Sequence, residues 1–334
     1  MKKATVFGAG SFGTAVAQVL SSNFDEVMLW GRDAALVEAI NSKHENVNYL
    51  PGLSLDARIR ATTDPVASAR DTELVIVATP SQATRDFFGK MKPAFPDHIP
   101  IVTVAKGIEN DTLCTMTEVL EQCLPEQYHS SIAVLSGPSF AKEMVLRLPT
   151  LVTIASKFEK TARAAQAMFQ CDSFRTYTSN DVVGVQVGGA LKNVIAIAAG
   201  MSDGLGLGHN SRAAIITRGL AEMTRIAVRM GGNPLTLSGL AGMGDLVLTC
   251  TGELSRNRKV GMELGKGRKL DDILREVKQV AEGVKTAKSA KDLAVKFGVE
   301  LPICEQVYAI AWEGKSAKAA VSDLMARTPK SELV

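Results

Sequence analysis

The sequence predicts an α/β fold in which an N-terminal doubly wound sheet is followed by a C-terminal all-helical domain. Short apolar runs alternate with amphipathic segments through the first half of the chain, a pattern typical of strand–helix–strand repeats in a parallel sheet. After about Asn180, β-branched runs give way to Ala, Leu, Lys and Glu at helical spacing. Because no long linker separates the halves, we expect two closely packed domains, at residues 1–180 and 181–334, with a ligand site in the cleft between them.

The expected strands are continuous apolar runs, as in parallel strands that are covered on both faces. They are Ala4–Phe7, Val27–Trp30, Leu74–Ala78, Ile101–Val104, Ile132–Leu135 and Leu151–Ile154. Amphipathic spacing predicts helices between them, at Phe12–Leu20, Ala34–Ile40, Gln82–Met91 and Leu113–Leu124. Helical spacing in the second half predicts further helices at Arg212–Met230, Asp271–Val277, Val284–Phe297 and Leu301–Trp312.

Composition limits the class of protein. The 334 residues suffice for two domains with their own cores, and a net charge of +3 is too small to imply a polyanionic partner. Five cysteines without a CxxC pair predict buried free thiols in a reducing compartment. Four scattered histidines show no metal-ligand spacing. The apolar N-terminal run is broken at Gly8, unlike a signal peptide, so we expect a cytoplasmic protein without a structural metal.

A glycine-rich turn follows the first expected strand. Residues 8–13 read GAGSFG and lead into a helix, which is the context in which this motif predicts a Rossmann-like, dinucleotide-binding domain. Gly8 permits the tight turn, Gly10 lets the backbone approach a pyrophosphate, and Gly13 lets the helix lie close to the sheet. The helix N-terminus supplies N–H donors for phosphate. A glycine-rich turn that binds no ligand is the alternative.

The end of the second strand indicates which dinucleotide is bound. It contains Arg32 and Asp33. An acid at this place holds the ribose hydroxyls of NAD, whereas an arginine suits the 2′-phosphate of NADP. Asp33 also fits the N-cap of the helix Ala34–Ile40, which leaves Arg32 better placed for the ligand. We therefore expect NADPH to be preferred over NADH, with a solvated surface arginine as the alternative.

Two loops follow strands at the edge of the sheet where open α/β folds bind ligands. The loop after Ile101–Val104 contains Lys106, and the loop after Ile132–Leu135 contains Gly137 and Ser139. Lys106 is placed to reach a substrate, and the other two offer backbone and hydroxyl donors. A surface lysine is the alternative interpretation of Lys106.

A single lysine interrupts the most apolar stretch of the chain. Residues 182–201 read VVGVQVGGALKNVIAIAAGM, in which Lys192 carries the only charge. A buried lysine needs a partner, a shifted pKa or a chemical role. In a helix, Gly188 and Gly189 share its face and would leave room for a ligand, so we interpret Lys192 as a catalytic lysine at the floor of a pocket. A core helix whose lysine snorkels to the surface is the alternative, and polar residues near the centre disfavour a membrane span.

Two motifs of the second half complete the candidate site. A glycine-rich turn ends in Asp245, a carboxylate able to hold Lys192 and to tune its proton affinity, with a helix N-cap as the alternative. Ser255, Arg256 and Asn257 open a basic segment that suits a dianionic phosphate. A solvated basic face is its alternative. The low net charge and the lack of interleaved aromatic residues disfavour nucleic acid.

Together these segments resemble the bacterial-type, NAD(P)-dependent sn-glycerol-3-phosphate dehydrogenase family over essentially the whole chain. The matching segments are GAGSFGTA, VAKGIE around Lys106, LSGPSFAKE from Leu135, GGALKNVIAIAAGMSDGLGLG from Gly188, AGMGDLVLTCTGELSRNR from Ala241 and VAEGVKT from Val280. The resemblance implies reversible reduction of dihydroxyacetone phosphate to sn-glycerol 3-phosphate, and a product that feeds phospholipid synthesis.

The resemblance also implies roles for the matching residues. Lys192 would be the proton donor and acceptor, assisted by Asp245, while Lys106 would lie at both cofactor and substrate. The implied substrate positions are Gly137, Ser139, Ser255, Arg256 and Asn257, beside Lys106, Lys192 and Asp245. With the glycine turn Gly8, Gly10 and Gly13, the implied cofactor positions are Ser11, Phe12, Arg32, Lys106, Ala141, Arg256, Val280 and Glu282.

We expect a small-molecule phosphate as the partner, NADPH or NADH as the cofactor, and neither nucleic acid nor a membrane span. A homodimer is expected. One rival function is a lysine-dependent dehydrogenase of the same architecture that acts on a hydroxy acid. Another is a non-catalytic dinucleotide sensor, which would need neither Lys192 nor Asp245.

Overall fold

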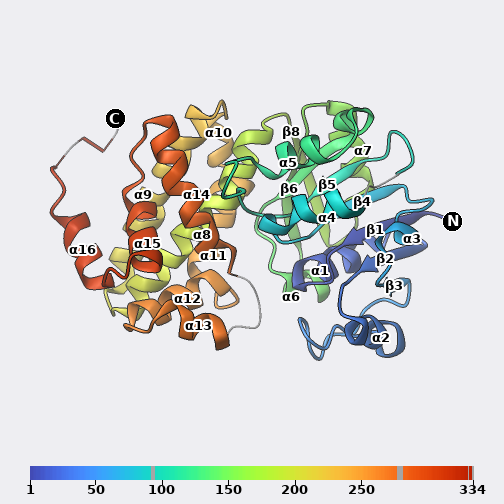
Figure 1. Ribbon diagram of the computed structural model, residues 1–334, viewed down its shortest axis with the longest axis horizontal. Coiled ribbons are helices and arrows are strands. Elements are labelled where there is room, and N and C mark those ends of the chain that lie inside the picture. The colour runs from blue at the N-terminus through green and yellow to red at the C-terminus, as the bar shows by residue number, and fades with distance from the viewer. Residues whose placement is uncertain (92–94, 277–280, 330, 333–334) are drawn as a thin grey trace.

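The computed structural model describes residues 1–91, 95–276, 281–329 and 331–332. Figure 1 shows a sheet with its covering helices at one end of an elongated molecule and a group of helices at the other. The last strand ends at Ser179, and helices alone follow from Val182 through the rest of the described chain. The predicted order of an α/β part followed by an all-helical part is confirmed.

Within the described residues, eight strands form one sheet in the order β3-β2-β1-β4-β5-β6-β7-β8. The strands are β1 (Lys3–Phe7), β2 (Glu26–Trp30), β3 (Ile59–Thr62), β4 (Leu74–Val77), β5 (Ile101–Thr103), β6 (Ile132–Ser136), β7 (Thr150–Ala155) and β8 (Phe174–Ser179). Val6 of β1 lies beside Leu29 of β2 and Ile76 of β4, both in parallel register. The winding therefore reverses between β1 and β4, and such a switch point opens a crevice for ligands beyond the carboxyl ends of the strands.

One strand pair departs from the parallel sheet that the sequence predicts. β7 runs antiparallel to β6, with Leu135 beside Ile154, while β8 is parallel to β7. The connection between β6 and β7 contains only the short helix α6 (Ala141–Val145). Because so short a helix does not carry the chain back along the sheet, β7 starts from the edge at which β6 ends.

The two strands absent from the prediction, β3 and β8, are both outer strands. Buried and exposed residues alternate in β3, which reads IRAT, and in β8, which reads FRTYTS. The prediction relied on continuous apolar runs, and these fit strands with both faces covered. In β4, for example, Leu74 and Ile76 belong to one core cluster, whereas Val75 and Val77 belong to another. An outer strand with one wet face lacks that signature.

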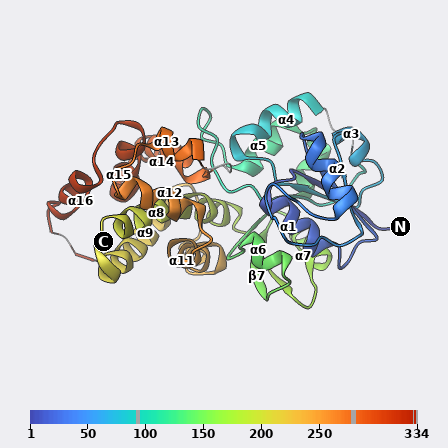
Figure 2. The same ribbon diagram turned by 90° about the horizontal axis from the view of Figure 1, so that it is seen from below.

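Helices cover both faces of the sheet. Figure 2 shows α1 (Ser11–Leu20), α6 and α7 (Glu159–Phe169) on one face, with α4 (Thr84–Met91) and α5 (Met116–Cys123) on the other. The helices α2 (Ala34–Lys43) and α3 (Pro65–Ser68) follow β2 and β3. As predicted, Asp33 caps α2, because its carboxylate accepts hydrogen bonds from the backbone N–H groups of Ala35 and Leu36 at 2.9 and 3.2 Å.

The helical part is built around α8 (Val182–Gly204). Its neighbours are α9 (Gly208–Arg229), α10 (Pro234–Leu237), α11 (Asp245–Thr251), α12 (Arg256–Gly265), α13 (Leu270–Glu276), α14 (Glu282–Phe297), α15 (Pro302–Trp312) and α16 (Ala317–Met325). The four helices predicted here are found, with ends shifted by a few residues; Val277 lies outside the described residues. α8 is long and apolar enough to span a membrane, but 94% of its most apolar window is buried inside the fold.

Glycines bring α12 into backbone contact with α8. A Cβ on Gly200 of α8 would lie 2.0 Å from the carbonyl oxygen of Arg258, and one on Gly261 of α12 would lie 2.0 Å from that of Ile197. Any larger residue at either position would force the helices apart. Because Lys192 also belongs to α8, this packing fixes the position of the start of α12 relative to Lys192.

The cysteines only partly follow the prediction. Cys250 and Cys304 are buried, whereas Cys114, Cys123 and Cys171 are half-buried; all five are free thiols. The prediction of uniformly buried cysteines is therefore wrong: Cys114 and Cys171 lie in connections between helices and strands, and Cys123 is the last residue of α5. Among the described residues, no group of three or more His, Cys, Asp or Glu side chains gathers in an arrangement that would hold a metal ion.

Candidate active site

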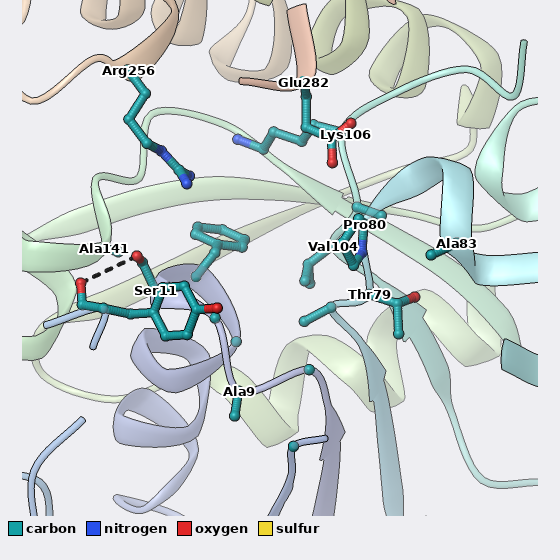
Figure 3. A pocket seen from close by; sticks show the side chains of 18 of the residues that line it. Ala9, Ser11, Thr79, Pro80, Ala83, Val104, Lys106, Ala141, Arg256 and Glu282 are labelled. Atoms are coloured by element: carbon teal, nitrogen blue, oxygen red, sulfur yellow. Dashed lines mark hydrogen bonds between the residues drawn. The ribbon is translucent and has the colours of Figure 1, made fainter. Parts of the chain in front are cut away.

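A cleft of about 1620 Å³ lies where the sheet meets the helices. In Figure 3, Arg256, Lys106 and Glu282 enter it from one side, and Ser11 of the glycine turn lies across from them. Most of the residues that the sequence predicts for the site line this cleft: Gly8, Gly10, Ser11, Phe12, Gly13, Arg32, Lys106, Ser139, Ala141, Lys192, Ser255, Arg256, Asn257 and Glu282. Gly137 and Asp245 are outside the lining, and Val280 lies outside the described residues.

The glycine turn has the geometry that the sequence predicts. Gly8 has a φ of +127°, which L side chains rarely adopt. A Cβ on Gly13 would lie 1.9 Å from the carbonyl oxygen of Gly8, so α1 approaches the turn more closely than any larger residue allows. A Cβ on Gly10 would meet no atom within 4 Å. Gly10 therefore presents bare backbone to the cleft at the start of α1, as phosphate binding requires.

A buried carboxylate joins two lysines that line the cleft. Asp245 Oδ1 accepts a hydrogen bond from Lys192 Nζ at 2.5 Å, and its Oδ2 accepts one from Lys106 Nζ at 2.7 Å. The exposed fractions of these side chains are 1% for Asp245, 7% for Lys192 and 15% for Lys106. Lys192 therefore does not snorkel to the surface, and Asp245 holds it as predicted. Asp245 is the first residue of α11, not its N-cap.

Burial and charge set the protonation of this group. Burial lowers the pKa of Lys192 to about 8; Asp245 opposes this change, and the Lys106 ammonium adds to it. Burial raises the pKa of Asp245, but the ammonium groups of Lys106 and Lys192 outweigh that effect and hold it below its ordinary value. Asp245 is therefore ionised at neutral pH, and Lys192 is able to release or take up a proton near pH 8.

Two glycines next to Lys192 serve packing, contrary to the prediction that they leave room for a ligand. A Cβ on Gly188 would lie 2.5 Å from the carbonyl oxygen of Ala241, and one on Gly189 would lie 2.6 Å from Ser136 Oγ. The space is filled by the turn before α11 and by the end of β6. These contacts bring Lys192 to the carboxyl edge of the sheet, and the cleft opens on the side of Lys106 and Asn193.

The loop after β6 places Gly137 and Ser139 behind Lys106. The carbonyl oxygen of Gly137 accepts hydrogen bonds from Lys106 Nζ at 3.1 Å and from Ser139 Oγ at 2.8 Å. Gly137 has a φ of +146°, and a Cβ on it would lie 2.9 Å from Cα of Val152. Gly137 thus orients Lys106 from outside the cleft, whereas Ser139 lines it.

The start of α12 faces the same space. Ser255 caps this helix by accepting a hydrogen bond from the N–H of Arg258 at 3.2 Å. The next residue, Arg256, is exposed and lines the cleft. Asn257 Nδ2 donates to Asn193 Oδ1 at 2.9 Å, and Asn257 Oδ1 accepts from the N–H of Gly283 at 3.0 Å. A helix N-terminus beside an arginine is an arrangement that binds phosphate.

Sequence reasoning missed two polar residues beside Lys192. Thr249 Oγ1 accepts a hydrogen bond from Lys192 Nζ at 2.9 Å and donates one to the Asp245 carbonyl at 2.6 Å. Asn193, the residue after Lys192, joins α8 to the start of α12. A signal for Thr249 was present, because it lies four residues after Asp245 and therefore shares its helical face. For Asn193 the sequence holds no comparable signal.

The cofactor positions at the second strand and at α14 also face the cleft. Arg32 is exposed at the end of β2 and lines the cleft. Glu282, the first residue of α14, accepts a hydrogen bond from Ser81 Oγ at 2.7 Å. This contact joins the segment after β4 to the helical part at a residue, Glu282, that lines the cleft.

A glycine turn at the switch point of a doubly wound sheet, facing a cleft that a buried lysine–carboxylate pair also adjoins, is an arrangement typical of nicotinamide-dependent dehydrogenases. Residues 3–162 match the family described as NAD-dependent glycerol-3-phosphate dehydrogenase N-terminus, and residues 181–322 match that described as its C-terminus. The chain belongs to the NAD-dependent glycerol-3-phosphate dehydrogenase family.

Individual relatives agree along nearly their whole lengths. The chain is 67% identical to a glycerol-3-phosphate dehydrogenase [NAD(P)+] from Myxococcus xanthus and 53% identical to one from Anaeromyxobacter dehalogenans, covering 99% or more of each. A crystal structure of glycerol-3-phosphate dehydrogenase from Coxiella burnetii superposes with a TM-score of 0.92 at 36% identity, over 98% of this chain and 99% of that one.

Proposed function

We propose that this protein catalyses the reversible NAD(P)H-dependent reduction of dihydroxyacetone phosphate to sn-glycerol 3-phosphate. The observation that carries the proposal is the Lys192–Asp245–Lys106 group, whose lysines line a cleft that is also lined by the glycine turn and the start of α12. The family of the chain supports the same reaction.

The described residues fit a dinucleotide. The bare backbone of Gly10 and the N-terminus of α1 suit the pyrophosphate, and Arg32 suits a 2′-phosphate. The bound nicotinamide ring supplies or accepts the hydride. The ring centroid of Phe12, which belongs to the glycine turn, lies 5.4 Å from Lys106 Nζ, so the turn and the lysines face the same space.

The substrate is bound at its phosphate and polarised at its carbonyl. Arg256 and the first N–H groups of α12 bind the phosphate, which places the three-carbon chain over Lys192. The Lys192 ammonium then gives its proton to the oxygen that develops negative charge during reduction, and the neutral amine takes a proton from the alcohol in the reverse direction. Lys106, held by Asp245 and by the Gly137 carbonyl, stabilises the same oxygen.

Loss of reduced-nicotinamide absorbance with purified protein tests the proposal. Dihydroxyacetone phosphate should be reduced rapidly, whereas unphosphorylated dihydroxyacetone and hydroxy acids should be poor substrates. Turnover of a hydroxy acid but not of the phosphate would favour the rival dehydrogenase. Dinucleotide binding without turnover of either would favour the sensor.

Replacing the arginine at the start of α12 should chiefly weaken substrate binding. Arg256→Ala removes charge-assisted hydrogen bonds to phosphate, so KM for dihydroxyacetone phosphate should rise about 10- to 100-fold. Steady-state kinetics at saturating NADPH measure this change. Arg275→Ala, which removes an exposed arginine of α13 outside the cleft, is the matched control. An unchanged KM in Arg256→Ala would refute the assignment.

Replacing the arginine at the end of β2 should change cofactor preference. Arg32→Ala removes the group that would pair with a 2′-phosphate, so NADPH affinity should fall about 10-fold or more while NADH affinity stays the same. Titration of each dinucleotide by fluorescence gives both dissociation constants. Equal losses for both dinucleotides would show that Arg32 does not read the 2′-phosphate.

The same proposal extends to the setting of the enzyme. It assigns residues 1–180 to a Rossmann-like dinucleotide-binding domain and residues 181–334 to a helical domain that binds the substrate and carries the catalytic lysine. It places the protein in the cytoplasm as a homodimer, with a product that feeds phospholipid synthesis. Analytical ultracentrifugation tests the oligomeric state, and cell fractionation tests the location.

A further inference from the structure

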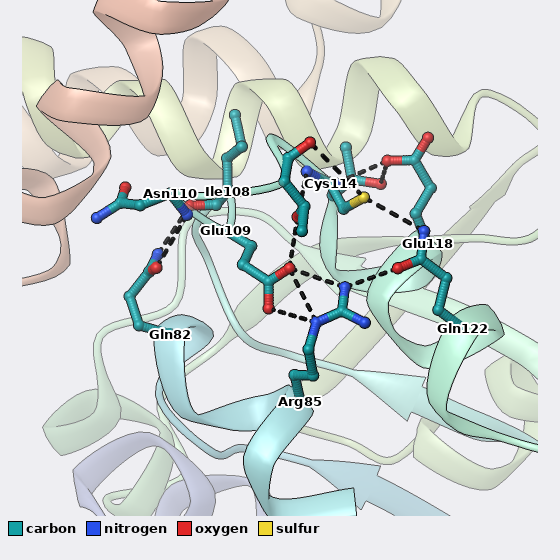
Figure 4. A network of polar contacts seen from close by, with 10 residues as sticks. Gln82, Arg85, Ile108, Glu109, Asn110, Cys114, Glu118 and Gln122 are labelled. Atoms are coloured by element: carbon teal, nitrogen blue, oxygen red, sulfur yellow. Dashed lines mark hydrogen bonds and ion pairs between the residues drawn. The ribbon is translucent and has the colours of Figure 1, made fainter. Parts of the chain in front are cut away.

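Three segments that are far apart in the sequence meet in a polar joint beside the cleft. The joint consists of Gln82 and Arg85 near the start of α4, Glu109 and Asn110 in the loop after β5, and Ser289 of α14 (Figure 4 shows it without Ser289). The loop in question is the one that carries Lys106. None of the five residues lines the cleft.

The amide of Gln82 holds the backbone of this loop at two points. Its Nε2 donates to the carbonyl oxygen of Ile108 at 2.7 Å, and its Oε1 accepts from the N–H of Asn110 at 3.0 Å. From the opposite side, Ser289 Oγ donates to the same carbonyl at 2.9 Å. The Ile108 side chain is fully buried in the core of the helical part. The loop is therefore tied both to the sheet part and to α14.

A bidentate ion pair fixes the next residue. Arg85 Nε donates to Glu109 Oε1 at 2.9 Å and Arg85 Nη2 donates to Oε2 at 2.8 Å, while Thr112 Oγ1 donates to Oε2. The Arg85 hydrogen bond lowers the pKa of the Glu109 carboxyl, so that it is ionised at neutral pH. The Glu109 side chain is 10% exposed and that of Arg85 is 36% exposed. Two parallel hydrogen bonds between a guanidinium and a carboxylate fix the orientation of the Glu109 side chain as well as its distance from Arg85.

Lys106 is only three residues from Glu109. The residue between Lys106 and Ile108 is Gly107, and a Cβ on it would lie 2.4 Å from Ser81 Oγ. The loop therefore passes tightly between the start of α4 and α14 before Lys106 turns its ammonium toward Asp245. Small movements at Glu109 are transmitted to Lys106 because this backbone has little free space.

We propose that Glu109, held by Arg85, is a positioning residue that acts through the loop after β5 to keep the Lys106 ammonium against Asp245. The pair touches neither the cleft nor the proposed substrate site. Its effect on turnover rests on the proposed function, whereas its effect on the lysines does not.

The position of Lys106 matters for Lys192. The charges that act on Lys192 are those of Asp245, which raises its pKa, and of Lys106, which lowers it; the Cys250 thiol of α11 stays protonated, because burial raises its pKa to about 12. If Lys106 withdraws, Asp245 pairs with Lys192 alone. The pKa of Lys192 then rises above about 8, and Lys192 is less able to act as a proton acceptor near neutral pH.

Competitive acetylation of lysines across a pH series, read by peptide mass spectrometry, tests this without any substrate. In Glu109→Ala the titration midpoint of Lys192 should rise by about one unit relative to the unaltered protein. Glu109→Gln, which keeps an acceptor for Arg85, should shift it less. Arg85→Ala breaks the same pair from its more exposed side and should reproduce the shift. Glu121→Ala removes a carboxylate of α5 that pairs with Lys157 and should leave the midpoint unchanged.

Turnover provides the second readout. In Glu109→Ala, kcat with dihydroxyacetone phosphate should fall about 10-fold through misplacement of Lys106, with NADPH affinity unchanged. A Lys192 midpoint equal to that of the unaltered protein in Glu109→Ala and Arg85→Ala overturns the inference, even if kcat falls. Absence of turnover in the unaltered protein would refute the proposed function, while the labelling result would still decide the inference.

Discussion

Lys192→Ala should lower kcat for reduction of dihydroxyacetone phosphate by about 10²- to 10⁴-fold, the usual contribution of a general acid. The fold should survive the change, because Asp245 keeps its second partner, Lys106, at 2.7 Å. NADPH affinity should stay within a few-fold of normal, since the hydrogen bonds of Lys192 go to Asp245 and Thr249 and not to the glycine turn. Near-normal turnover would refute the role of Lys192. Lys160→Ala, at an exposed lysine of α7, is the matched control.

The pH dependence of the unaltered enzyme follows from the same group. Reduction needs the Lys192 ammonium, and burial lowers its pKa to about 8. The rate of reduction should therefore fall as pH rises through about 8, whereas the rate of glycerol 3-phosphate oxidation should rise over the same range. Initial rates in both directions from pH 6 to 10 measure this. Two profiles with the same direction would contradict proton transfer by Lys192.

Local chemistry made much of the fold and the site predictable. The solitary charge of Lys192 in an apolar stretch predicted a buried partner, and Asp245 is that partner. The glycine turn was predictable because each glycine is required for its own steric reason: Gly8 has a positive φ, and Gly13 has no space for a Cβ beside the Gly8 carbonyl oxygen. The central strands were predictable because both of their faces are buried, as the two core clusters of β4 show.

What escaped prediction depends on contacts between distant segments. The sequence places small residues at Gly188 and Gly189 but does not say which neighbour fills the space; it is Ala241 and Ser136, not a ligand. The polar joint of Gln82 with residues 108–110 requires the crossing of α4, a loop and α14, which no local pattern encodes. The antiparallel direction of β7 relative to β6 depends likewise on the path of the short connection between these two strands.

Asp245→Asn should cost both activity and stability. The change leaves the ammonium groups of Lys106 and Lys192 close together in a buried place without their carboxylate, and removing one partner of a buried ion pair typically costs about 3–5 kcal/mol. Part of this cost is avoided because Lys192 is able to lose its proton. The pKa of Lys192 should then fall below about 8, so that the proton donor is partly lost at neutral pH and kcat falls about 100-fold or more.

The sign of the stability change with pH distinguishes this mechanism from simple loss of packing. In Asp245→Asn the folded state binds fewer protons than the unfolded chain at neutral pH, because the pKa of Lys192, already lowered by burial, loses the carboxylate that raised it. Unfolding free energy should therefore increase with pH from 6 to 9, more steeply than in the unaltered protein. Thermal unfolding across this range measures the slope.

Asp203→Asn is the comparison variant for the pH dependence of unfolding free energy in Asp245→Asn. Asp203 also holds two cations, Arg212 at 3.0 Å and Arg258 at 2.7 Å, with similarly small exposed fractions of 14–19%. Arginine does not lose its proton in this range, so the loss of stability in Asp203→Asn should be the same at pH 6 and pH 9. Equal slopes in the two variants would mean that Asp245 stabilises the fold without controlling the protonation of Lys192, and the proton-transfer role proposed for the pair would fail with it.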